Sequence, residues 1–208
     1  METVLLPASS PEALRRAVEI LRASGLVAFP TDTVYGVGAL AFDAAAIEQI
    51  YLAKGRPAEK AIPILLGDAQ QLEQVAVEVS NTALKLAARF WPGPLTLVVP
   101  KRPSIPAAAS TTPTIGVRVP DHPVARALLR AAGPMAVTSA NLSGQASPST
   151  AEEVLAQLGG RIALILDGGK TPGGVPSTVV NCLGAEPQSL REGPIMLEQI
   201  NSALFPNP

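Results

Sequence analysis

The chain has 208 residues with 16 basic and 17 acidic side chains, which gives a formal net charge of −1. This balance disfavours broad electrostatic binding of nucleic acid, so any anion site must be local. Hydrophobic residues make up 47%, and no apolar run approaches the roughly 18 residues of a membrane span, so we expect a globular protein with no membrane attachment. The one cysteine, Cys182, allows no internal disulfide. The first residues lack the basic start of a signal peptide, and together these features predict a cytoplasmic protein.

Apolar periodicity and turn residues predict strands and helices that alternate along the chain. Strands are expected at 3–6, 26–29, 64–66, 95–99, 114–119, 135–137, 163–166, 177–181 and 188–191. Helices are expected at 11–23, 43–53, 68–76, 80–90, 121–130, from 149 onward with a capping box from Ser149 to Glu152, and at 195–204. Residues 103–113 are expected to form a mobile loop. Some neighbouring strands have no helix between them, and the chain shows no composition break or repeat, which predicts one α/β domain over 1–208 with a mixed sheet.

Three cations, Lys54, Arg56 and Lys60, lie within seven positions at the end of the predicted helix 43–53. Gly55 and Pro57 stop that helix, so Arg56 and Lys60 belong to an irregular turn. Such a turn could hold a polyanion such as a triphosphate. A lysine placed favourably at a helix C-terminus, followed by a solvated basic turn, explains the same residues.

Polar side chains follow two predicted strands. Thr31, Asp32, Thr33 and Tyr35 come after the strand 26–29, and loops at strand ends are where α/β proteins carry ligand groups. A capped turn, in which these side chains satisfy local backbone groups, is the alternative. The segment 138–144 after the strand 135–137 allows the same two interpretations.

Arg118 shares a strand face with Thr114 and with the bare backbone of Gly116, where an anion could lie. An arginine on an exposed strand face is equally consistent with this pattern. The only histidine, His122, lies between Asp121 and Pro123, so catalytic triads and zinc sites are disfavoured. These patterns favour the binding of a charged small molecule over covalent catalysis.

Taken together, several segments resemble the YrdC-like family of threonylcarbamoyl-AMP synthases. The resemblance covers residues 25–193 and rests on Phe29–Gly36, Lys54-x-Arg56-Pro57, Phe90–Thr96, Val117–Pro120, Ser139-x-Asn141, Asp167–Gly169 and Ser177–Val180. It implies a twisted mixed α/β sheet with flanking helices, whose concave face forms a deep, positively lined cavity. Some members of this family carry a further C-terminal domain, and we expect this chain to lack it.

The resemblance also implies a reaction in which L-threonine, bicarbonate and ATP give threonylcarbamoyl-AMP and pyrophosphate. The product would serve the modification of tRNA next to the anticodon, with tRNA or tRNA-modifying proteins as partners. A magnesium ion is expected with the triphosphate of ATP, but no acidic cluster marks protein ligands, so no protein-bound metal is predicted.

The residues of this site follow from the same resemblance. Lys54 and Arg56 are the catalytic candidates, and Thr31 and Tyr35 belong to a supporting loop. The implied ATP contacts are Arg56, Lys60, Thr114, Ser139, Asn141, Ser147 and Arg191. The implied threonine contacts are Thr33, Leu65, Arg118, Val137 and Ser177. Lys60 and Leu65 lie where other members vary.

Two other hypotheses compete with the synthase. One is a module that binds double-stranded RNA or tRNA on the same concave surface, although the near-neutral charge and the 3% aromatic content count against it. The other is a divergent paralogue that keeps the cavity and acts on another substrate.

Overall fold

The computed structural model describes residues 2–172, 174–184 and 186–205. Its strands are β1 (Val4–Pro7), β2 (Val27–Pro30), β3 (Tyr35–Leu40), β4 (Ile64–Leu65), β5 (Leu95–Pro100), β6 (Thr114–Arg118), β7 (Met135–Ser139), β8 (Leu164–Asp167), β9 (Thr178–Asn181) and β10 (Gln188–Arg191). Its helices are α1 (Pro11–Arg22), α2 (Ala44–Lys54), the 3-10 helix η1 (Ala69–Gln71), α3 (Leu72–Val75), α4 (Asn81–Phe90), α5 (Pro123–Ala132), α6 (Ala151–Leu158) and α7 (Leu197–Leu204). None of the helices in these ranges has the length and apolar character that a membrane crossing requires.

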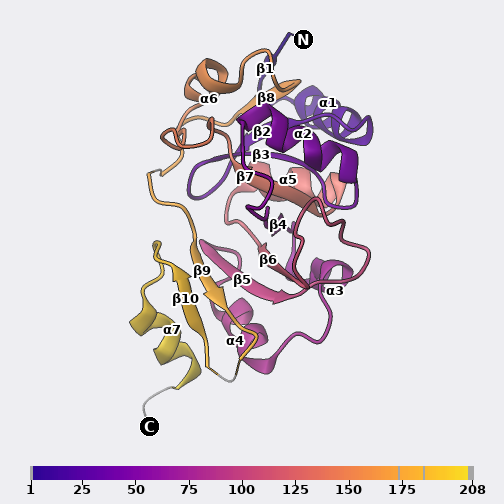
Figure 1. The fold of residues 1–208 in the computed structure, drawn as a ribbon. Coiled ribbons are helices and arrows are strands. Elements are labelled where there is room, and N and C mark those ends of the chain that lie inside the picture. Colours follow the sequence, from indigo (N-terminus) through magenta and orange to yellow (C-terminus); the bar gives the residue numbers. More distant parts are fainter. Residues whose placement is uncertain (1, 173, 185, 206–208) are drawn as a thin grey trace.

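The described strands form one twisted sheet of ten in the order β1-β8-β2-β3-β7-β4-β6-β5-β9-β10. The sheet combines parallel pairs such as β1–β8 and β5–β9 with antiparallel pairs such as β3–β7 and β5–β6. The sheet runs the length of the molecule, from β1 near the N-terminus to β9 and β10 near the C-terminus (Figure 1). This confirms the predicted mixed sheet with flanking helices.

Successive residues of the central strands face two separate cores, because side chains alternate across a strand. In β2, Ala28 belongs to a core built with helices α2, α4 and α6, whereas Val27 and Phe29 belong to a core built with α1 and α5. Strands β7 and β8 divide their side chains in the same way. The sheet is therefore covered on both faces at its β1–β7 end.

In the second half of the sheet, the same alternation separates a core face from a cavity face. Leu95 and Leu97 of β5 face the core that contains α4, and so does Val117 of β6. The residues of opposite parity, Thr96 on β5 and Arg118 on β6, line a cavity on the other face. The cavity thus lies on the sheet face that α1 and α5 cover farther along.

Helix α2 ends as its sequence predicts. Gly55 has φ 58°, a left-handed conformation that glycine adopts at little cost, and its N–H bonds the carbonyl of Leu52. Asp43 caps the start of the helix by accepting a hydrogen bond from the backbone N–H of Ala46. Lys54 is the last helical residue and is buried.

Three local predictions were wrong. Tyr35 belongs to strand β3 and not to a loop, because Gly36 and Gly38 leave the backbone bare where Val137 of β7 packs against it. The cap of α6 is Thr150, whose side chain accepts from the N–H of Glu153, and not Ser149 with Glu152. The single helix expected at 68–76 is split into the 3-10 helix η1 and the short helix α3.

Candidate functional site

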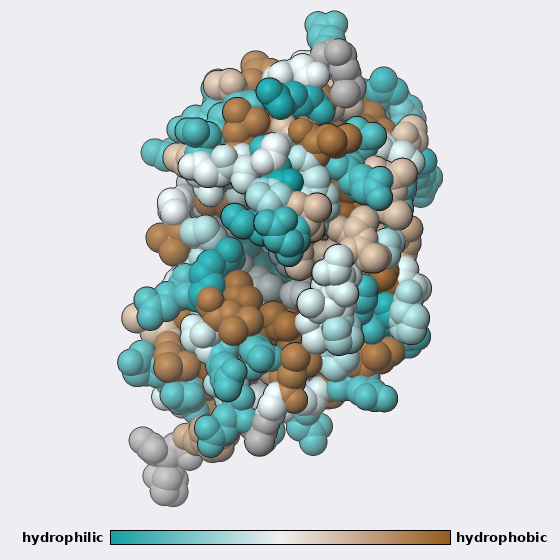
Figure 2. Space-filling view, viewed as in Figure 1, coloured by the Kyte–Doolittle hydropathy of each residue, from teal (hydrophilic) through white to brown (hydrophobic). Residues whose placement is uncertain are grey.

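A cavity of about 350 Å³ opens on the sheet face that carries Thr96 and Arg118. Figure 2 shows a hollow in the middle of this side of the molecule, bordered by hydrophilic and hydrophobic residues. Its walls come from β3, β4, β5, β6, β7, β9 and β10, which places segments from both ends of the chain around one space.

The predicted threonine contacts lie together in this cavity. Thr33, Leu65, Arg118, Val137 and Ser177 all line it. They come from five separate segments, and the sheet brings them together because β6 pairs with β4, β4 with β7, and β5 with β9.

The predicted ATP contacts divide into two groups. Arg56, Ser139 and Arg191 line the cavity, and so does Thr31 of the supporting segment. Lys60, Thr114, Asn141 and Ser147 are not among the residues that line it, and neither is the catalytic candidate Lys54.

The charge of the cavity wall is entirely positive. Arg56, Arg118 and Arg191 line it, and none of the described residues that line it is acidic. A wall of this kind favours an anionic ligand, and guanidinium groups bind carboxylate and phosphate oxygens in a bidentate manner.

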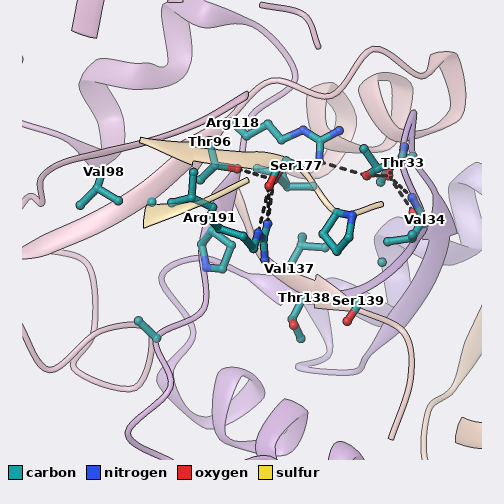
Figure 3. Close-up of a pocket in the computed structure, with 18 of the residues that line it drawn as sticks. Thr33, Val34, Thr96, Val98, Arg118, Val137, Thr138, Ser139, Ser177 and Arg191 are labelled. Atoms are coloured by element: carbon teal, nitrogen blue, oxygen red, sulfur yellow. Dashed lines mark hydrogen bonds between the residues drawn. The ribbon is translucent and has the colours of Figure 1, made fainter. Parts of the chain in front are cut away.

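Arg118 is held in place by three residues from two segments of the chain. Its Nε donates to the carbonyl oxygen of Gly93 at 3.0 Å. Its Nη1 donates to Oγ1 of Thr33 at 3.2 Å (Figure 3). Its Nη2 forms an ion pair with Oδ1 of Asp32. Burial lowers the pKa of Arg118, and the charge of Asp32 opposes that shift. Because a guanidinium has five N–H groups, two remain for a ligand beyond the three that are bonded within the described structure.

Thr33 is positioned by a short turn after β2. Oγ1 of Thr31 accepts hydrogen bonds from the backbone N–H groups of Thr33 and Val34 and lies 3.0 Å from Oγ1 of Thr33. The capped-turn interpretation of this segment is therefore confirmed, and the turn orients Thr33 toward Arg118. The ligand-site interpretation stays a prediction.

Arg191 reaches the cavity from the edge of the sheet. The pairing of β10 with β9 shifts register between Ser189 and Arg191, and such a bulge redirects the side chains that follow it. Arg191 donates through Nε and Nη2 to the carbonyl oxygen of Ser177, at 3.0 and 2.7 Å, and through Nη2 to Oγ of Ser177 at 3.1 Å (Figure 3). Burial lowers its pKa.

Arg56 lies on the turn after α2 and is braced by that turn. Its Nε donates to the carbonyl oxygen of Lys60 at 3.2 Å and its Nη2 to that of Ala61 at 2.9 Å. Burial lowers its pKa. Lys60 thus contributes a backbone carbonyl to the site, while the residue itself is exposed.

Lys54 lies behind the cavity wall. It is 2% exposed, and its ammonium group donates to the backbone carbonyls of Ser139 and Asn141. The backbone N–H of Ser143 bonds the carbonyl of Lys54 at 2.8 Å. Burial, followed by the charge of Arg56, lowers the pKa of Lys54 to about 7. Lys54 therefore joins α2 to the cavity residue Ser139 at the end of β7 and to Asn141 in the segment that follows.

The remaining predicted residues surround this framework. Nδ2 of Asn141 donates to the carbonyls of Leu142 and Gln145, at 2.8 Å each, which shapes the segment after β7. Oη of Tyr35 donates to the carbonyl of Gly169 at 2.8 Å and accepts from the N–H of Gly168 at 3.2 Å, and burial raises the pKa of Tyr35 to about 12. Thr114 and Ser147 are half-buried outside the cavity lining.

Thr96 also lines the cavity and was not predicted to do so, whereas Gly116 lines it on the strand face where the sequence pattern allowed an anion. A Cβ at Gly116 would lie 3.0 Å from Cγ2 of Thr96 and 3.2 Å from Cβ of Pro63, so the glycine leaves room for both. The alternation of apolar residues in β5 already pointed Thr96 away from the core. The pattern did not show which side chain it would meet.

A sequence model of the Sua5/YciO/YrdC family, described as "telomere recombination", matches residues 19–193. The chain belongs to this family. Among curated members, threonylcarbamoyl-AMP synthase of Bacillus subtilis is 45% identical over 196 residues, which are 93% of this chain and 57% of that protein. A putative threonylcarbamoyl-AMP synthase of Mycobacterium tuberculosis is 41% identical over 95% of this chain and 92% of that protein.

Solved structures of the Sua5/YciO/YrdC family share the fold. The crystal structure of Pyrococcus abyssi Sua5 complexed with L-threonine has a TM-score of 0.93 and 41% identity, and the match covers 99% of this chain and 61% of that one. Escherichia coli YciO has a TM-score of 0.84 at 30% identity and matches over 96% of this chain and 98% of its own. The chain thus spans little more than half the length of the first curated relatives and nearly all of some other family members.

Proposed function

We propose that this chain is an L-threonylcarbamoyladenylate synthase, which converts L-threonine, bicarbonate and ATP into threonylcarbamoyl-AMP and pyrophosphate. The observation that carries the proposal is the cavity, in which three arginines and no described acidic residue surround the whole set of expected threonine contacts. An amino acid carboxylate and a triphosphate are the kind of anions that such a wall binds. Relatives that carry this activity in their names, and a Sua5 structure complexed with L-threonine, support it.

The reaction requires two bond-forming steps. The amine of threonine attacks bicarbonate, a C–N bond forms, and water leaves, which gives a carbamate. An oxygen of the carbamate then attacks the α-phosphorus of ATP, the bond to the bridging oxygen of the β-phosphate breaks, and pyrophosphate leaves with the electron pair.

We assign the residues by their chemistry. Arg118, through the N–H groups that the protein does not use, binds the threonine carboxylate together with Ser177 and Thr33. Arg56 and Arg191 stabilise the negative charge that moves onto the phosphates, and Ser139 contacts the nucleotide. Positioning and electrostatic stabilisation carry most of the catalysis in such transfers, so no nucleophilic side chain is needed.

Magnesium belongs to the nucleotide in this proposal. Among the described residues, no group of three or more histidine, cysteine or acidic side chains is placed to hold a metal ion. We therefore propose that Mg²⁺ enters with the triphosphate of ATP and shields its charge. The unstable product would pass to tRNA-modifying proteins in the cytoplasm.

The test is pyrophosphate release from ATP by the purified chain, with threonine and bicarbonate omitted in turn. Release that requires both, with L-serine a poor substitute, is the expected result. Nucleotide binding without release would favour the divergent paralogue. Neither release nor nucleotide binding, together with tRNA affinity that falls steeply with salt, would favour the RNA-binding module.

A further inference from the structure

Thr96 forms a hydrogen bond inside the cavity that the proposed mechanism does not yet use. It lies on β5, is 4% exposed and lines the cavity. Its Oγ1 is 2.8 Å from Oγ of Ser177, which lies 81 residues away in the chain and is 5% exposed (Figure 3). The parallel pairing of β5 with β9, in which Thr96 is opposite Val179, brings the two hydroxyls together.

The hydrogen bonds at Ser177 determine the direction of its hydroxyl proton. A serine hydroxyl has two lone pairs and one proton. Arg191 has only donors, so its Nη2 occupies one lone pair of Ser177 Oγ at 3.1 Å. Within the described structure, Ser177 Oγ is the only hydrogen-bond partner of the Thr96 hydroxyl. Because a buried donor without an acceptor is costly, Thr96 donates and fills the second lone pair.

Neither Arg191 nor Thr96 then accepts the hydroxyl proton of Ser177, so this proton is directed toward the cavity. There it is an oriented donor to an anion, and the two bonds that its oxygen accepts strengthen it as a donor. The methyl group of Thr96 packs toward Gly116, where a Cβ would come within 3.0 Å of Cγ2, which fixes the rotamer of Thr96.

We propose that Thr96 is a positioning residue that orients the Ser177 hydroxyl as a hydrogen-bond donor to the carboxylate of the amino acid substrate. This assignment rests on the proposed function for the identity of that substrate. Thr96 acts through Ser177 and makes no contact with the substrate itself.

The test is a double-mutant cycle with Thr96→Val and Ser177→Ala, in which binding of L-threonine is measured by calorimetry. Thr96→Val keeps the shape and removes the hydroxyl, and we expect binding weakened about tenfold, the loss of roughly one hydrogen bond. Adding Thr96→Val to Ser177→Ala should cause no further loss. Thr96→Ser, which restores the hydroxyl, should recover affinity to within about twofold of the wild type, as expected for an unchanged hydrogen bond. If Thr96→Val does not fold, Thr96→Ala removes the same hydroxyl.

Thr178→Val is the matched control. Thr178 is equally buried on the adjacent strand β9, but its hydroxyl bonds the backbone of Ile195. The Thr178→Val variant should have a lower melting temperature and unchanged threonine affinity. This control separates a loss of stability from a loss of orientation of the Ser177 hydroxyl.

Several outcomes would overturn the assignment. One is Thr96→Val with wild-type threonine affinity, and another is a full additional loss in the Ser177→Ala background, which would mean that Thr96 contacts the substrate directly. A wild-type chain that binds no L-threonine would also overturn it. Failure of the proposed function is seen separately, as a wild-type chain that binds L-threonine but releases no pyrophosphate.

Discussion

The ammonium group of Lys54 donates a hydrogen bond to the backbone carbonyl of Ser139, 85 residues further along the chain. A second bond reaches the carbonyl of Asn141, so one buried side chain joins the end of α2 to the segment after β7. Lys54 thereby sets the position of the cavity residue Ser139 from behind, and its substitution should affect stability and nucleotide use together.

Lys54→Met keeps most of the buried aliphatic volume and removes the donor. The backbone carbonyls of Ser139 and Asn141 lose their hydrogen-bond donor, so we expect the free energy of unfolding to fall by about 2–4 kcal/mol. We also expect kcat/KM for ATP to fall at least about tenfold, as for the loss of one positioned contact. Chemical denaturation and pyrophosphate release measure the two effects. Lys85→Met, on the exposed surface of α4, is the control, and equal stability of the two variants would contradict the role of Lys54.

The pKa of Lys54 predicts a pH dependence of stability. Burial lowers this pKa from 10.5 to about 7 in the folded chain. Between these values the unfolded chain holds a proton at Lys54 that the folded chain does not, so folding releases it and the unfolding free energy rises with pH. Below pH 7 both states are protonated and this dependence disappears. Denaturant titrations should show that the unfolding free energy of the wild type rises between pH 7 and pH 9. The rise should be smaller in Lys54→Met, because this variant lacks Lys54 and keeps the other titrating groups.

Arg118 should determine the use of threonine. Arg118→Ala removes two N–H groups from the proposed carboxylate site. It also leaves the largely buried carboxylate of Asp32 without its partner, which costs roughly 3–5 kcal/mol of stability. The double variant Asp32→Asn/Arg118→Met removes that penalty and tests the ligand role alone. We expect its KM for threonine to rise by about 100-fold, as for the loss of a charge-assisted bidentate contact, with little change in the affinity for ATP. Equal losses for both substrates would contradict the assigned role.

Arg56 should determine the use of ATP. Arg56→Ala removes a charge from the cavity wall, and we expect ATP binding or turnover to weaken by about 1.5–3 kcal/mol, the usual contribution of a hydrogen bond to a charged group. Nucleotide titration and steady-state kinetics with varied ATP measure this loss. Arg22→Ala, at the exposed end of α1, controls for net charge. Unchanged kinetics in Arg56→Ala would rule out its role.

Much of this protein could be predicted from local sequence. The alternation in 114–119 placed Arg118 on the face opposite to the core-facing residues of β6, and Gly55 ended α2 in a left-handed conformation. Apolar periodicity is a local property, since each side chain is directed by its own backbone. The family resemblance also led us to expect five threonine contacts, and the sheet brings these five residues into one cavity.

Contacts between segments that are distant in the sequence could be identified only from the tertiary structure. Strand β3 was missed because Gly36 and Gly38 disfavour a strand locally, and only the packing of Val137 explains them. The burial of Lys54 against two carbonyls depends on where β7 ends. The partnership of Thr96 with Ser177 exists because β5 and β9 are neighbours in the sheet. Strand order is a property of the whole chain, because long-range pairing joins residues whose local sequences carry no information about each other.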